Sequence, residues 1–385
     1  MSRLAERMAG IRPFHVMALL ERARALEASG RSVVHMEIGE PDFPAPPPVT
    51  AAGVAALQSH RTFYSPAAGL PALREAIAAA YAPEARPGPE QVVVTPGSSG
   101  ALNLVFGVLL DPGDEVLMAD PGYPCNRHFV RLFNGRAVLV PVGPESAYQL
   151  TAEAVRRNWS ASTRAVMVAS PSNPTGTLIE DDELARIVET VAALGGVLIV
   201  DEIYHGLVYS GTVRSVLHHS DAAFVVNSFS KYYGMTGWRV GWLVAPKDYV
   251  DAVVRLAQNI FISASTPAQH AALAALSPEA IAEFDRRREV FRRRRDFLLP
   301  ALEGLGFRIP VRPGGAFYIY AECSAHTDDS FAFAWDLLET TGVAVTPGLD
   351  FGDNAPERHL RFSYANAIEN LEEGVRRIAG YLGRG

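Results

Sequence analysis

The sequence predicts an α/β fold: a large domain with a mostly parallel central sheet flanked by helices, plus a smaller α+β domain. Between residues 50 and 245, short apolar runs alternate with helical stretches, as in strand–helix–strand units. These runs are continuously apolar, which is typical of strands buried on both faces. With 385 residues, the chain is also too long for one ordinary core, so about two domains are expected.

The N-terminal part predicts an arm and a linker. Residues 14–28 place apolar side chains on or near one face of a helix: Phe14, Met17, Leu19, Leu20, Ala23 and Leu26. The apolar run "VVHMEIG" and the proline-rich crossing "EPDFPAPPP" at 40–48 follow. We therefore assign residues 1–47 to the arm and to part of the small domain.

The large domain is expected over residues 48–285 and the small C-terminal domain over residues 286–385. In the large domain the predicted strands read "QVVVTP", "EVLMAD", "RAVLVPV", "RAVMVASP", "GVLIVDE", "AFVVNSF" and "VGWLVAP". Helical patterns run from about 247 to 303. The C-terminal part has two further helices and the predicted strands "GFRIP", "GGAFYIY", "GVAVTP" and "HLRFSY".

Composition and charge exclude several classes of protein. The net charge of −7 argues against a nucleic-acid binder. One basic run, "DRRREVFRRRRDF" at 285–297, is interrupted by acidic residues and has apolar residues at helical spacing, so we expect a solvated helix face. Two distant cysteines form neither a disulfide framework nor a metal site. Neither a signal peptide nor a membrane span is recognisable, and we expect a cytoplasmic protein with no membrane partner.

Polar clusters follow five of the predicted strands of the large domain. They read "TPGSSG" (95–100), "ADPGYP" (119–124), "SPSNPTG" (170–176), "DEIY" (201–204) and "NSFSK" (227–231). Because ligands of such sheets bind at the carboxyl ends of the strands, we expect these clusters to meet in one site.

The first cluster opens a helix with two serines and two glycines. Free N–H groups and the helix dipole would make this an anion site, although Ser98 or Ser99 could simply cap the helix. The pattern is not a P-loop, because G-x-x-x-x-G-K-[ST] does not occur. This absence also weakens the interpretation of "GVLIVDE" as the Mg²⁺-binding strand of an ATPase.

Single residues in the other clusters allow more than one role. Asp201 ends a buried strand and needs a cation: a protonated ring nitrogen, a metal, or an arginine of the fold. Tyr204 could reach the same ligand. Asn173 lies either in a plain turn or in a loop that its prolines make rigid, with a cis bond as one option.

The sequence contains only two lysines, Lys231 and Lys247, against 33 arginines. Lys231 lies among aromatic and glycine residues, where desolvation and nearby cations would turn the amine into a nucleophile able to form a Schiff base. Arg239 could hold a phosphate together with Ser228, or form an ion pair. Arg361, inside an apolar strand, needs a carboxylate from the protein or from a ligand.

Together these residues supply what pyridoxal phosphate needs when it is bound as a lysine Schiff base. The chain resembles the aspartate-aminotransferase-like family (class I/II, fold type I) of pyridoxal-phosphate enzymes. The resemblance runs from "IGEPDFP" at 38–44, through "YSPAAGLPALREAI" at 64–77, to "LRFSYA" at 360–365. The order and spacing of "SPSNPTG", "DEIY" and "SFSKYYGMTGWRVGW" make it specific.

The resemblance implies a role for each matching position. Lys231 would bind the cofactor covalently and move the proton, and Asp201 would pair with the ring nitrogen. Asn173 and Tyr204 would contact the ring oxygen, and Tyr123 would stack on the ring. The substrate carboxylate would be bound by Arg361, Gly39 and Asn173. The phosphate would be held by Ser98, Ser99, Gly100, Ser228 and Arg239, and by Tyr64 from the neighbouring subunit of a homodimer with shared active sites.

The resemblance implies an aminotransferase that moves the α-amino group of an L-amino acid to a 2-oxo acid by a ping-pong mechanism. A β-lyase or synthase using the same cofactor is the alternative, and a cofactor-sensing regulator is disfavoured because no DNA-binding segment precedes the first helix. The substrate side chain stays open, since an acidic one would need a further cation. Arg12, Arg31, Arg61 and Arg127 are the candidates for that cation.

Overall fold

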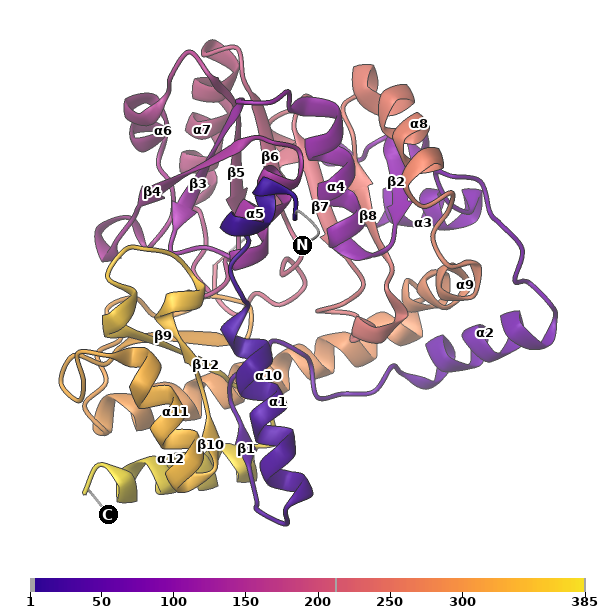
Figure 1. Ribbon diagram of the computed structural model, residues 1–385. Helices are drawn as coiled ribbons and strands as arrows, with labels where there is room; N and C mark the ends of the chain where they lie inside the picture. The colour runs from indigo at the N-terminus through magenta and orange to yellow at the C-terminus, as the bar shows by residue number, and fades with distance from the viewer. Residues whose placement is uncertain (1–3, 212, 384–385) are drawn as a thin grey trace.

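A computed structural model describes residues 4–211 and 213–383. The centre of the molecule is a seven-stranded sheet in the order β2-β8-β7-β6-β5-β3-β4 (Figure 1). The strands are β2 (Val92–Thr95), β3 (Glu115–Asp120), β4 (Arg136–Pro141), β5 (Thr163–Ala169), β6 (Val197–Asp201), β7 (Phe224–Ser228) and β8 (Gly241–Val244). Only β8 runs against its neighbours, β7 and β2. All seven predicted strands of the large domain are therefore confirmed.

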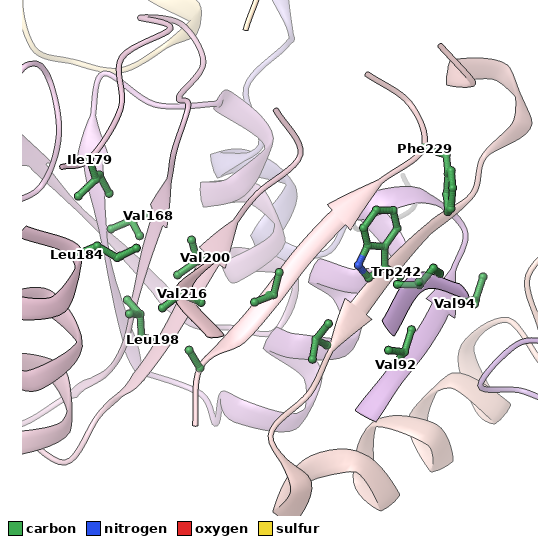
Figure 2. Close-up of a cluster of buried hydrophobic side chains, with 14 of the residues drawn as sticks. Val92, Val94, Val168, Ile179, Leu184, Leu198, Val200, Val216, Phe229 and Trp242 are labelled. Carbon is green, nitrogen blue, oxygen red and sulfur yellow. The ribbon is translucent and has the colours of Figure 1, made fainter. Parts of the chain in front are cut away.

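Helices cover both faces of this sheet. The side chains of Val92, Val94, Leu198 and Val200 point to one face, which packs against α3 (Pro71–Ala80), α6 (Ala152–Asn158), α7 (Asp181–Ala193) and α9 (Thr266–Ala275). Figure 2 shows part of this cluster, with Trp242 and Phe229 at its far end. The alternate residues, such as Val93 and Ile199, pack against α4 (Gly97–Leu109), α5 (Pro124–Leu132) and α8 (Val250–Ile260). Burial of successive side chains on opposite faces explains the continuous apolar runs.

The smaller α+β part combines both ends of the described chain. Its three-stranded antiparallel sheet has the order β11 (Thr346–Pro347), β12 (His359–Ser363) and β9 (Tyr318–Glu322). The strand β1 (Val34–His35), which precedes the linker, pairs in parallel with β10 (Val343–Ala344). Three helices pack around these strands: α1 (His15–Ala28), α11 (Ser330–Thr341) and α12 (Ile368–Tyr381).

Two long helices connect this part with the larger one. The helix α2 (Pro47–Gln58) follows the linker and packs on α9, and α10 (Pro278–Gly304) runs beneath both parts (Figure 1). Phe284 of α10 belongs to the core of the large sheet and Phe291 to the core of the smaller part. The domain limit predicted at 285/286 therefore falls inside one continuous helix, and the outer limits, 1 and 385, lie outside the described residues.

The basic run on α10 was expected to be a solvated helix face, and this prediction is wrong for three of its arginines. Arg287, Arg294 and Arg295 are each at most 7% exposed. Arg294 forms two hydrogen bonds of 2.7 and 2.8 Å with the carboxylate of Asp42, and Arg295 donates to the carbonyl of Pro313. The run therefore fastens neighbouring segments to α10, because each buried guanidinium meets an acceptor. Among the described helices, none is long and apolar enough to cross a membrane.

Candidate active site

The carboxyl ends of the central strands open into a cavity of about 300 Å³. The turns after β2, β3, β5, β6 and β7 all contribute to its wall, as the parallel direction of these strands requires. The smaller part of the molecule closes the other side with Tyr318 and Arg361. The expected meeting of five strand ends in one site is confirmed by this geometry.

Lys231 follows β7 and extends into the cavity. Its Nζ donates a hydrogen bond of 2.6 Å to the carbonyl oxygen of Gly39. Burial lowers the pKa of this amine to about 8, with a further contribution from the guanidinium of Arg361. At pH 7, a pKa of about 8 leaves about a tenth of the amine unprotonated and nucleophilic, far more than in an ordinary lysine.

Glycine is required at position 39 for this arrangement. A Cβ on Gly39 would lie 2.1 Å from the hydroxyl oxygen of Tyr318, so a larger residue would displace either the Tyr318 side chain or the segment whose carbonyl accepts from Lys231.

An anion cradle lies at the N-terminus of α4, beside Lys231. Ser98, Ser99 and Arg239 line the cavity there. Gly97, at the first position of the helix, has a φ of +71°, and a Cβ on it would lie 2.7 Å from Nη2 of Arg239. Arg239 donates to the carbonyl of Thr236 at 2.9 Å and, within the described chain, forms no ion pair. The helix N-terminus and an unpaired guanidinium therefore face one small space, an arrangement suited to a phosphate.

The two serines before Lys231 occupy different places. Ser230 lines the cavity, whereas the hydroxyl of Ser228 is buried and its single proton is shared between Ser230 Oγ at 2.8 Å and the carbonyl of Val240 at 3.2 Å. Ser228 thus positions Ser230 in this geometry, and its direct contact with a phosphate stays a prediction. Gly100 is buried one turn inside α4, away from the cavity wall.

Asp201 ends β6 at the floor of the cavity. One carboxylate oxygen accepts the N–H of Ile203 at 3.0 Å, and no arginine of the described chain forms an ion pair with it. Burial raises the pKa of Asp201 to about 7, while Lys231 opposes this shift. An internal Asp–Arg pair is therefore not the role of Asp201, and its carboxylate stays available for a cation from a ligand.

Three tyrosines surround the space above Asp201. The hydroxyls of Tyr204 and Tyr318 form a hydrogen bond of 2.9 Å. Tyr123 begins α5 at the cavity wall, and its ring meets that of Phe14 edge to face at 6.3 Å. Burial raises the pKa of each of these phenols, so all three stay protonated and can donate hydrogen bonds.

Arg361 is the cation on the far side of the cavity, and it is 2% exposed. It donates to Asn173 Oδ1 at 3.0 Å, to Thr346 Oγ1 at 3.2 Å and to the carbonyl of Glu37. Its Nε has no partner, and within the described residues no carboxylate forms an ion pair with it. A buried guanidinium bound only to neutral acceptors calls for an anion from outside the chain.

The loop around Asn173 contains cis bonds at Ser170–Pro171 and Asn173–Pro174, and its rigidity stays a prediction. Because the oxygen of Asn173 accepts from Arg361, its amide nitrogen is the group that can face a ligand.

Some predicted residues do not line the cavity of their own chain. Tyr64 is 80% exposed on a loop, which is compatible with a role in a neighbouring subunit. None of the four candidate arginines lines the cavity. Arg12 pairs with Asp353, and Arg31 and Arg127 donate to backbone carbonyls of Glu339 and Asp350.

Sequence reasoning missed Tyr318 as well as Glu40, Thr236 and the apolar wall. The string "GGAFYIY" was assigned only to a strand, and nothing in it distinguishes Tyr318, which points into the cavity, from Tyr320. The glycine pair before it is a signal of close approach, since the Cβ of Gly315 would lie 2.5 Å from Pro171 in the loop of Asn173.

Comparison with known proteins agrees with this geometry. The family model described as "Aminotransferase class I and II" matches residues 31–378. The chain belongs to the class I and II aminotransferase family. The valine–pyruvate aminotransferase of Mycobacterium tuberculosis is 42% identical to this aminotransferase over 97% of both chains. The (5-formylfuran-3-yl)methyl phosphate transaminase of Methanocaldococcus jannaschii is 35% identical over 99% of this chain and all of that one.

Solved structures show the same similarity over the whole fold. A crystal structure of an aminotransferase from Mycobacterium tuberculosis has a TM-score of 0.96 at 42% identity and full coverage of both chains. The aspartate aminotransferase of Thermus thermophilus with maleate has a TM-score of 0.93 at 37% identity, covering 99% of this chain and all of that one. The predicted fold class and the predicted aminotransferase activity are therefore confirmed.

Proposed function

We propose that this aminotransferase uses pyridoxal phosphate and transfers the amino group of an L-amino acid with an apolar side chain to a 2-oxo acid by a ping-pong mechanism. The observation that supports it best is the pair of uncompensated cations, Lys231 and Arg361, in one cavity. One is a nucleophilic amine, and the other is a guanidinium suited to a carboxylate.

The residues present fit pyridoxal phosphate. The cradle at Gly97, Ser98, Ser99 and Arg239 suits its phosphate, and the buried Asp201 suits its protonated ring nitrogen. Asn173 and Tyr204 would contact the ring oxygen, Tyr123 would stack on the ring, and Lys231 would bind its aldehyde carbon. When bound, the cofactor supplies the electron sink that stabilises negative charge on Cα of the amino acid.

The chain's own groups would position the substrate and move its proton. Arg361 and the amide of Asn173 would hold the α-carboxylate, which orients the Cα–H bond. The unprotonated amine of Lys231 would take the proton from Cα, and its conjugate acid would return a proton one step later. The carbonyl of Gly39, which accepts from Nζ at 2.6 Å, would keep the amine within the cavity between these steps.

The apolar substrate class is supported by the remaining wall of the cavity. Its apolar side chains include Phe14, Val16, Met17, Leu102 and Phe129. Among the residues that the structure describes, Lys231, Arg239 and Arg361 are the only cations lining it. A side-chain carboxylate would have no cation of this wall to meet, so its burial would be costly. The name of the Mycobacterium tuberculosis relative, a valine–pyruvate aminotransferase, agrees with this proposal.

We also propose a homodimer with shared active sites in the cytoplasm. The exposed apolar side chains on α2, the following loop and the end of α8 support the dimer: Val54, Leu57, Phe63, Tyr64, Ile260 and Ile262. An exposed apolar group of this kind marks an interaction surface. The cytoplasmic location stays a prediction from the sequence.

The half-reaction tests the proposed function. Holoenzyme mixed with L-valine and no oxo acid should form pyridoxamine phosphate and 2-oxoisovalerate in equal amounts, and L-aspartate should react far more slowly. Release of ammonia or pyruvate from β-substituted amino acids, with no pyridoxamine phosphate, would instead establish the lyase alternative. Faster turnover of L-aspartate than of L-valine would contradict the apolar substrate class.

A further inference from the structure

A second cavity, of about 480 Å³, lies on the outer side of α5. The short 3-10 helix η1 (Glu6–Gly10) forms one wall, and α5 with the start of β4 forms the other. The cavity shares no lining residue with the active site. We call it the arginine cleft, after Arg7, Arg12, Arg127, Arg131 and Arg136 in its wall.

Positive charge dominates the arginine cleft. His128 lines it together with the five arginines, and of the residues that the structure describes only Glu6 and Asp353 add carboxylates to its wall. Arg12 pairs with Asp353, and Arg136 pairs with Glu115. Arg12 and Arg136 therefore have an ionic partner, and the charges of Arg7, Arg127 and Arg131 need another explanation.

These three guanidiniums donate to backbone carbonyls alone. Arg7 donates to Leu132 at 3.1 Å, Arg131 to Arg7 at 3.2 Å and Arg127 to Asp350 at 3.1 Å. Within the described ranges, 4–211 and 213–383, none of the three forms an ion pair. Each guanidinium carries five N–H donors, so most of these donors stay free to bind an anion.

The backbone around the cleft is shaped for these side chains. A Cβ on Gly10 would lie 1.9 Å from Cζ of Arg131, so glycine leaves the space that this guanidinium occupies. Arg7 and Arg131 each donate to the segment that carries the other, which fastens η1 onto α5. These hydrogen bonds hold both arginines at the cleft, where their side chains are exposed to solvent.

Mutual repulsion acts within this cluster. The pKa of Arg127 is lowered by burial and then by Arg12, and the carboxylates of Asp353, Asp120 and Asp350 oppose this shift. The pKa of His128 is lowered by burial and by Arg127, Arg12 and Arg131. Arg131 lies in the last turn of α5 and Arg7 donates to the carbonyl of Leu132 at its end, so the helix C-terminus accounts for these two cations but not for Arg127. A bound anion would relieve this repulsion.

We propose that the arginine cleft binds a small multivalent anion with phosphate or carboxylate groups. The planar forks of Arg7, Arg127 and Arg131 match either group in bidentate geometry. The volume of about 480 Å³ is that of an ordinary small-molecule site. This site is additional to the anion cradle at Arg239 and the carboxylate site at Arg361.

Binding of inorganic pyrophosphate and of citrate to the cofactor-saturated enzyme tests the proposal. Isothermal titration calorimetry would compare the wild type, an Arg7→Ala/Arg131→Ala variant and an Arg157→Ala/Arg293→Ala variant. Arg157 and Arg293 are exposed arginines outside the cleft, so the control removes the same charge. Saturation with cofactor keeps the probe out of the cradle at Arg239, and thermal unfolding of each variant verifies that it is folded.

We expect at least one probe to bind the wild type and the control with the same Kd. The cleft variant should bind this probe at least about tenfold more weakly, because charge-assisted hydrogen bonds are lost. Binding of pyrophosphate alone would indicate a phosphate ligand, and binding of citrate alone would indicate a carboxylate ligand. Failure of both probes to bind, or an equal Kd in the two double variants, would overturn the proposal.

Discussion

At the scale of single residues, the active site depends on charges that have no partner of opposite charge. Lys231, Arg239 and Arg361 line one cavity, and within the described residues none of them forms an ion pair. Because a protein interior tolerates such groups poorly, their concentration in one place indicates a site for an anionic ligand. In the proposed function, these ligands are a phosphate at Arg239 and a carboxylate at Arg361, with the amine of Lys231 between them.

The lowered pKa of Lys231 can be measured in the cofactor-free enzyme. The amine should react with dinitrofluorobenzene at a rate that rises with pH and reaches half its maximum near pH 8, because only the neutral amine is nucleophilic. In a denatured sample the same midpoint should move to about 10.4, the ordinary value for lysine. The label is measured on the peptide that contains Lys231. A midpoint above pH 10 in the folded enzyme would contradict the argument that burial lowers the pKa of this amine.

Sequence reasoning identified residues whose chemistry is unusual for their position. Lys231 stood out because lysine is rare in this chain, and Asp201 and Arg361 stood out because charges seldom occupy apolar strands. It favoured Ser228 over Ser230 for the phosphate, because Ser228 lies three residues before Lys231, and it could not foresee that the turn directs Ser230 to the cavity. Tyr318 was missed because tyrosine in a strand is ordinary.

At the scale of elements, the segment 38–44 connects the active site with α10. Its first residues line the cavity: Gly39 accepts from Lys231, and Glu40 accepts from Thr236. Its last residues are fastened to α10, since Asp42 pairs with Arg294 and the ring of Phe43 lies 5.1 Å from the guanidiniums of both Arg287 and Arg294. The contacts of Asp42 and Phe43 with α10 therefore also position Gly39 and Glu40 at the cavity.

An Asp42→Asn variant tests this connection. Removing one partner of a fully buried pair costs about 3–5 kcal/mol, and we expect a loss below about 3 kcal/mol because only Arg294 is buried while the Asp42 side chain is 27% exposed. The carbonyl of Gly39 should shift, and kcat/KM should fall by up to about 100-fold as Lys231 loses its position. Urea unfolding and steady-state kinetics measure the two effects.

An Arg293→Ala variant is the control, because Arg293 is an exposed neighbour on the same helix. Lower stability of Asp42→Asn with unchanged kcat/KM would show that the segment is only structural.

The buried arginines of α10 also show what a sequence pattern leaves open. The alternation of acidic and basic residues at 285–297 is typical of an exposed helix, and Glu283–Arg286 and Glu289–Arg292 do form such surface pairs. Burial of Arg287, Arg294 and Arg295 depends on segments distant in sequence that supply Asp42, Pro44 and Pro313 as acceptors. No local signal marks those long-range contacts.

At the scale of the whole molecule, the sheet brings together residues that are far apart in the chain. The five polar strand ends were predictable, because parallel strands place their carboxyl ends on one edge. The packing of the smaller part against this edge could not be predicted, because it depends on the pairing of β1 with β10, which are about 300 residues apart in the sequence.

The proposed dimer predicts complementation between two defective chains. In a hybrid of a Lys231→Ala subunit and a Tyr64→Ala subunit, one site should receive both lesions and the other neither. The hybrid should then recover about half of the wild-type activity, as the two-fold arrangement of shared sites requires. Tandem-tagged hybrids purified after co-expression provide the measurement, and activity no higher than half that of the Tyr64→Ala homodimer would place Tyr64 in its own subunit's site.

The most direct test of the account is to find where the cofactor is attached. The holoenzyme is reduced with borohydride and digested, and the peptides are analysed by mass spectrometry. Because the chain has only two lysines, the attachment site is a choice between Lys231 and Lys247. We predict a phosphopyridoxyl group on Lys231 alone, and no yellow, borohydride-reducible adduct in a Lys231→Arg variant. Label on Lys247, or a retained adduct in that variant, would contradict the account.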